Sequence, residues 1–159
     1  MNKYQINIRK MSRLAFPFKY DWIRNIIGTV LRVENVKQRI EIGVVITDDS
    51  VIKRLNKRYR KIDAPTDVLS FSIYSDIAQS LKESMKHDEN MRVQLGEIII
   101  SFPTATKQAG LHGSSVEKEV SLLLVHGTLH LLGHDHTLIA EARRMQSREK
   151  IIMGKLDLG

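Results

Sequence analysis

Apolar residues in the first half of the chain follow two different spacings. Gln5–Ile8 alternates polar and apolar side chains, and Ile40–Thr47 is rich in β-branched residues, so both segments are predicted to be strands. The apolar residues of Asp21–Val33 recur at the three- and four-residue intervals of an amphipathic helix. Asp48 and Asp49 are suited to cap a second helix, whose outer faces are basic. The first half is therefore predicted to alternate strand and helix.

The middle of the chain adds two predicted strands, Val68–Ile73 and Glu97–Ser101. The polar stretch from Tyr74 to Gln94 has no clear period, so it is predicted to be a long surface loop with a helical turn in it. A short helix is expected to follow over Pro103–Ala109, because proline suits the first turn of a helix.

Two longer helices are predicted to complete the fold. Ser114 and Glu117 have the spacing of a capping box, and the helix that follows is apolar on nearly every face over Val120–Leu132. That helix is expected to be central and buried. A last amphipathic helix is predicted over about Leu138–Lys155. The pattern as a whole predicts one α+β domain over residues 1–159, with a small mixed sheet of about four strands packed with helices.

The composition narrows the possible chemistry. The 159 residues include no cysteine, so a transition metal would have to take nitrogen or oxygen ligands. No stretch approaches the ~18 apolar residues of a membrane span, and the N-terminal residues lack the apolar core of a signal peptide. We therefore expect no membrane association and a cytoplasmic location.

The net charge of +7 is unevenly distributed. Residues 1–61 hold 15 Lys or Arg against 5 Asp or Glu, whereas residues 62–159 hold 10 against 13. A basic lobe of this kind is typical of proteins that bind a polyanion, because Lys and Arg displace counterions from phosphates. Small proteins are also often basic for solubility alone, and charge does not separate the two explanations.

Three histidines at the end of the predicted buried helix carry the clearest chemical signal. His126 and His130 are four residues apart, so they project side by side from a helix and can bind one ion. Gly133 is placed to end the helix in a left-handed turn, which would bring His136 back as a third ligand. The spacing repeats the ligands of the zincin motif, His-x-x-x-His-x-x-Gly-x-x-His. One zinc ion per chain is expected, although other ions that favour imidazole, such as nickel, fit the same spacing.

Three protein ligands leave the fourth position of a tetrahedral zinc open, which is the arrangement of catalytic sites. A water molecule at this fourth position would have a pKa of about 7. Zinc peptidases with this motif carry a Glu general base after the first His, whereas this chain has Gly127. A reaction that does not need this base, such as RNA cleavage, therefore fits better.

Three further residues each have more than one possible role. Arg60, at the end of the basic helix, is a candidate to bind a phosphate, or else it pairs with Asp63 or Asp67. His134 is a surplus ligand, a proton shuttle or, more simply, a wall of the site. Asp135 either accepts a hydrogen bond from a ligand imidazole or forms an ordinary turn.

Four blocks of sequence together resemble the YbeY family of bacterial endoribonucleases that mature rRNA. They are Leu55-Asn56 with Tyr59-Arg60, Asp63-x-Pro65-Thr66-Asp67-Val68-Leu69-Ser70-Phe71, Leu95-Gly96-Glu97-Ile98, and the segment from His126 to His136. The closing helix, with Met145 and Glu149, is also similar. Two positions depart from the family: His134 stands where Tyr is usual, and Ser72 stands where Pro is usual.

The resemblance implies a one-domain fold, zinc bound by His126, His130 and His136, and a functional role for Arg60 as the family's important arginine. It also implies a single-strand-specific endoribonuclease that acts in 16S rRNA 3′ end maturation, ribosome biogenesis and quality control. Its partners would be rRNA and the small ribosomal subunit, with ribosomal proteins or assembly factors.

Two other functions stay open on the sequence. A zinc-stabilised, non-catalytic ribosome-assembly factor would use the same histidines for stability alone. A zinc peptidase is suggested by the ligand spacing and opposed by Gly127.

Overall fold

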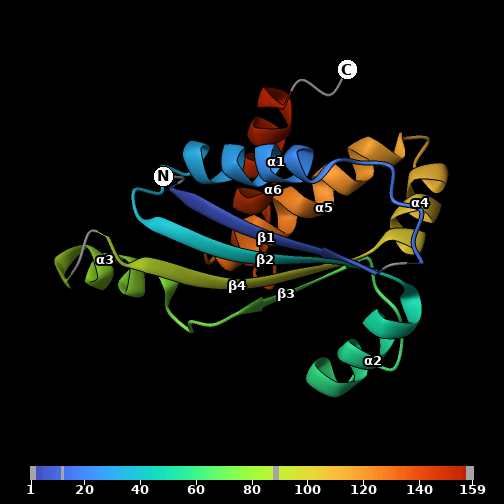
Figure 1. The fold of residues 1–159 in the computed structure, drawn as a ribbon, viewed down its shortest axis with the longest axis horizontal. Coiled ribbons are helices and arrows are strands. Elements are labelled where there is room, and N and C mark those ends of the chain that lie inside the picture. The colour runs from blue at the N-terminus through green and yellow to red at the C-terminus, as the bar shows by residue number, and fades with distance from the viewer. Residues whose placement is uncertain (1–2, 12, 88–89, 157–159) are drawn as a thin grey trace.

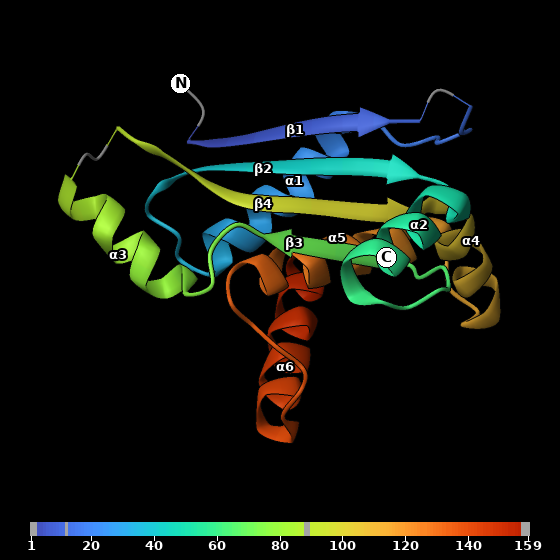
Figure 2. The same ribbon diagram turned by 90° about the horizontal axis from the view of Figure 1, so that it is seen from below.

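The computed structural model describes residues 3–11, 13–87 and 90–156, and no side chains over residues 85–87. Its four strands form one sheet in the order β1-β2-β4-β3, with β1 at Tyr4–Lys10, β2 at Arg39–Thr47, β3 at Val68–Ser72 and β4 at Arg92–Ser101. Strands β1, β2 and β4 are parallel, and β3 runs antiparallel to β4 (Figure 2). The prediction of an α+β fold with a small mixed sheet is confirmed.

Helices cover the two faces of this sheet unequally. In Figure 1, α1, α5 and α6 lie on one side of the sheet and α2 lies on the other. The helices within the described residues are α1 (Tyr20–Val33), α2 (Asp49–Arg60), α3 (Ile77–His87), α4 (Phe102–Leu111), α5 (Val116–Leu131) and α6 (Ile139–Lys155). In the described part of the chain, no helix has the length and apolar character that crossing a bilayer requires.

Burial of alternate residues explains why the sheet has one covered face. Ile40, Ile42, Val44 and Ile46 of β2 are at most 1% exposed, and they belong to the large apolar cluster shared with α1 and α5. Each such side chain contributes roughly 1.5–3 kcal/mol of burial free energy. A smaller cluster of Ile52, Leu69 and Ile99 joins α2 to the opposite face of β3 and β4. The rest of that face is open.

The prediction of a long loop from Tyr74 to Gln94 is wrong. The segment contains the helix α3 and the first residues of β4. The side chain of Asp76 accepts a hydrogen bond from the backbone N–H of Gln79 at 3.1 Å, which caps the start of α3. Leu81 packs against the main core. With so few apolar residues in contact with the core, the helix left no clear period in the sequence.

Strand β4 begins at Arg92, whereas the sequence predicts its start at Glu97. The prediction is too late because Gly96 interrupts the alternating pattern of the strand. The register with β2 shifts between Glu41 and Ile42, next to Gly96. Gly96 has a φ of +141°, and a Cβ on it would lie 1.9 Å from the carbonyl oxygen of Phe71. The close approach of β3 to β4 therefore requires glycine at this position.

The expected basic lobe is not a separate unit. Strands β1 and β2, which belong to the basic first part, share the sheet with β3 and β4 from the rest of the chain. Helices α1 and α2 of that same part lie on opposite faces (Figure 1). The basic residues are therefore divided between the two sides of the sheet.

Replacing Gly96 by Ala is expected to lower the free energy of unfolding by about 2–4 kcal/mol, because the new Cβ meets the Phe71 carbonyl in a backbone conformation that suits glycine. Gly154 of α6 is the matched control, since nothing lies within 4 Å of a Cβ built there. Gly154→Ala should raise stability by up to about 1 kcal/mol. Denaturant titration measures both values, and equal effects in the two variants would contradict the assigned contact.

Candidate metal centre

Helix α5 carries the first two predicted metal ligands. It begins after Ser115, whose hydroxyl accepts a hydrogen bond from the backbone N–H of Lys118 at 3.1 Å, so the cap is one residue later than predicted. The helix is buried along most of its length, as predicted. His126 and His130 are partly exposed, which leaves their rings available at one side of an otherwise apolar helix.

The end of α5 brings the third histidine back to the first two. Gly133 has a φ of +100°, and its N–H donates to the carbonyl of His130 at 3.0 Å, which closes the left-handed turn that the sequence predicts. The chain reverses there. The ring centroid of His136 consequently lies 5.8 Å from that of His126 and 6.2 Å from that of His130.

A carboxylate of the next helix fixes the orientation of His126. Its Nδ1 lies 2.7 Å from Oε1 of Glu149, whose side chain is only 17% exposed. With Nδ1 donating to this carboxylate, the lone pair of His126 is on Nε2 and is available to a metal ion. Sequence spacing gave no role to Glu149, because its contact with His126 is made across two helices.

His130 is partly buried, whereas His136 is exposed. Burial lowers the pKa of the His130 ring, which keeps the imidazole neutral and able to bind a metal at neutral pH. Its Nδ1 is buried and has no hydrogen-bond partner among the described residues. An unpaired buried nitrogen is costly unless a further group binds it, and a metal ion is such a group.

Asp135 forms a turn and also lies among the candidate ligands. Its Oδ1 accepts a hydrogen bond from the backbone N–H of His136 at 2.6 Å, and Oδ2 accepts one from Thr137 Oγ1 at 3.0 Å. These hydrogen bonds lower the pKa of Asp135. One ligand atom each of His130, Asp135 and His136 lies within 4.8 Å of the others. Imidazole nitrogens with a nearby carboxylate are usual donors for zinc, so the residues present fit that metal.

The three histidines share a pocket with Arg60. This pocket, called here the histidine pocket, has a volume of about 480 Å³ and is lined by Tyr59, Arg60, Thr66, Asp67, Val68, Ser70, Phe71, His126, His130 and His136. Asp63 lies 3.9 Å from Nζ of Lys53 and 3.8 Å from that of Lys57. Among the described residues, no ion pair joins Arg60 to either aspartate that the sequence offered as its partner.

His134 does not line the histidine pocket. Its Nε2 lies 3.4 Å from Oε2 of Glu34, at the end of α1. The other oxygen of Glu34 accepts a hydrogen bond from Nε of Arg148 at 2.7 Å. His134 therefore connects the loop after α5 with α1 and α6.

Gly127 is a packing requirement. A Cβ at this position would lie 2.9 Å from Cγ2 of Ile98 and 3.1 Å from Oγ of Ser70, so the helix is pressed against the sheet there. A glutamate side chain has no room between them. The general base of zinc peptidases is therefore excluded by the packing of α5 as well as by the sequence.

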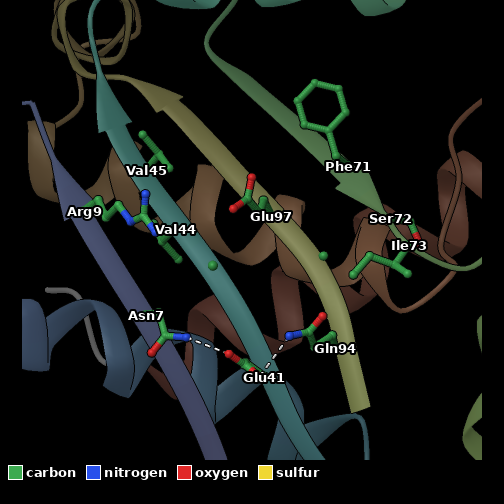
Figure 3. Close-up of a pocket in the computed structure, with 12 residues that line it drawn as sticks. Asn7, Arg9, Glu41, Val44, Val45, Phe71, Ser72, Ile73, Gln94 and Glu97 are labelled. Carbon is green, nitrogen blue, oxygen red and sulfur yellow. Dashed lines mark hydrogen bonds between the residues drawn. The ribbon is translucent and has the colours of Figure 1, made fainter.

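A second pocket, of about 410 Å³, lies on the open face of the sheet (Figure 3). Glu41 in its floor accepts hydrogen bonds from Asn7 at 2.8 Å and from Gln94 at 3.3 Å. Glu97 and Arg9 stand on the same face (Figure 3). Two carboxylates and one cation do not favour a phosphate, so the histidine pocket is the better candidate for a polyanion substrate.

Comparison with known proteins gives one family. The model of the family described as Endoribonuclease YbeY matches residues 6–157. The Endoribonuclease YbeY of Roseiflexus castenholzii is 41% identical over 155 residues, which cover 96% of this chain and 93% of the relative. The Endoribonuclease YbeY of Moorella thermoacetica is 40% identical over 136 residues, covering 86% and 85%.

A solution structure from Thermotoga maritima has a similar fold. It matches with a TM-score of 0.61 over 96% of this chain and 89% of that chain, at 22% sequence identity.

Replacing Glu149 by Gln should raise the dissociation constant for zinc by about 10-fold or more, because His126 loses the carboxylate that orients it. Glu117→Gln is the control, because Glu117 is exposed at the start of α5, the helix of His126; it should leave zinc affinity unchanged. Competition with a zinc-binding dye measures the affinity, and thermal melting checks that both variants are folded. Equal affinities would show that the Glu149 contact does not serve metal binding.

Proposed function

The chain belongs to the YbeY family, and from this membership we propose that it is a zinc-dependent endoribonuclease that cleaves single-stranded regions of ribosomal RNA. The relatives are named as endoribonucleases. The observation that carries the proposal is the histidine pocket itself, where Arg60, which forms no ion pair with Asp63 or Asp67, lines the same space as three converging imidazoles.

Each part of the pocket has a defined task in this proposal. His126, His130 and His136 hold the metal, with Glu149 orienting the first of them. Zinc bound there supplies Lewis-acid polarisation of a phosphoryl oxygen. Arg60 binds the non-bridging phosphate oxygens and stabilises the negative charge that builds up on them during cleavage.

The position of Arg60 suits this task. It is the last residue of α2, and Lys61 follows it in the left-handed conformation with a φ of 63°. The guanidinium is thus presented at a helix end that lines the pocket. The exposed residues Lys57 and Arg58 of the same helix end add positive charge beside the pocket, which attracts neighbouring phosphates without selecting a sequence.

We further propose that the RNA is the 3′ end of 16S rRNA on the small ribosomal subunit, in the cytoplasm, with ribosomal proteins or assembly factors as partners. The net charge of +7 supports an RNA partner. The lack of space for a side chain at Gly127 argues against peptide hydrolysis in the same pocket.

The test is cleavage of an rRNA fragment by identically purified wild type, His130→Ala, Arg60→Ala and Arg54→Ala, with zinc content measured in each. His130→Ala should lose zinc and cleavage together. Arg60→Ala should keep zinc and lose roughly 10²–10³-fold in rate, as expected when a donor to a developing anion is removed. Arg54 is exposed on the same helix and does not line the pocket, so its loss should change the rate little.

Equal cleavage by all four proteins would assign the activity to a contaminating nuclease. If the folded wild type binds the fragment and zinc without cutting, the non-catalytic assembly factor becomes the better description. In that case His126→Ala should lower thermal stability and ribosome binding together.

A further inference from the structure

An exposed aromatic ring stands at the rim of the histidine pocket. Tyr59 is 57% exposed, although a tyrosine normally buries most of its apolar ring. It directly precedes Arg60 in α2, and both residues line the pocket. The exposed ring therefore lies next to the group proposed to bind the phosphate.

Two neighbouring side chains contact the ring of Tyr59. Phe71 contacts it in a T-shaped arrangement, with centroids 5.3 Å apart and planes at 63°. Phe71 is itself packed against the small apolar cluster under α2. The guanidinium carbon of Arg58 also lies 5.3 Å from the centre of the tyrosine ring. A ring fixed in this way loses little conformational freedom when a ligand stacks on it.

Phe71 also extends this surface beyond the metal centre. It lines both the histidine pocket and the pocket on the open sheet face. Figure 3 shows its ring on the same face of the sheet as Glu97 and Val45. Tyr59 and Phe71 thus lie between the two pockets, where an RNA strand that leaves the histidine pocket over β3 would pass.

We infer that Tyr59, supported by Phe71, is a stacking platform for an unpaired base next to the scissile phosphate, and that it selects single-stranded over double-stranded RNA. Every base has a flat face that stacks on an aromatic ring, but in a duplex these faces are covered by neighbouring base pairs. An arginine that binds phosphate does not distinguish the two forms of RNA, whereas the adjacent ring does. The inference rests on the proposed function and assigns its strand preference to one residue.

The test compares wild type, Tyr59→Ala, Tyr59→Phe and Tyr20→Ala. Tyr20 is an exposed tyrosine of α1 and does not line the histidine pocket, so it is the matched control. Each zinc-loaded protein is mixed with a short unpaired RNA that carries 2-aminopurine, whose fluorescence falls when it stacks. The same proteins are then assayed for cleavage of that RNA, free and annealed to its complement.

Wild type, Tyr59→Phe and Tyr20→Ala should quench the probe and prefer the unpaired RNA. Tyr59→Ala should lose the quenching and show a KM for unpaired RNA that is about 10-fold higher, with kcat nearly unchanged. Its residual activity on the duplex should match that of wild type, so the preference falls by the same factor.

Unchanged quenching and strand preference in Tyr59→Ala would overturn the inference while the proposed function stands. Loss of both in Tyr59→Phe as well would overturn it too, because the hydroxyl and not the ring would then be the cause. A wild type that neither binds nor cuts either RNA would overturn the proposed function and the platform together.

Discussion

Burial of α5 between the sheet and the other helices is the interaction on which the rest of the molecule depends. The helix contacts β3, β4, α1, α4 and α6, and six of its side chains belong to the main apolar cluster. It packs tightly against the sheet at Gly127, where the distances to Ile98 and Ser70 leave no space for a side chain. The packing of α5 against the sheet at Gly127 therefore also fixes the positions of His126 and His130 relative to the sheet.

The metal centre combines this rigid helix with parts that are less constrained. His126 and His130 inherit their spacing from α5, whereas His136 is on the loop beyond Gly133 and depends on the turn made by Asp135. Arg60 comes from α2, which is joined to the other face of the sheet through a cluster of three buried side chains. The geometry of metal binding and that of phosphate binding are thus supported by different contacts.

Much of the metal centre could be predicted because it depends on residues that are close together in the sequence. The continuous apolar stretch of α5, the spacing of the three histidines and the left-handed turn at Gly133 are all set by residues within one segment. The helix α3 was missed because its few core contacts leave no period, and the early start of β4 was hidden by the bulge at Gly96. Glu149 and Tyr59 acquire their neighbours only when separate elements pack, so no spacing rule identifies them.

The hydrogen bond between Glu149 and His126 also has a consequence for when the metal centre forms during synthesis. Glu149 belongs to α6, which follows every other described element in the chain. Glu149 itself lies 23 positions after its partner His126. During synthesis the earlier elements emerge and begin to fold first. In the nascent polypeptide, the ring of His126 would therefore be oriented by Glu149 only after α6 has been translated and has packed against α5. Tight metal binding through His126 would thus be completed only after α6 has packed against α5, late in the synthesis of the described elements.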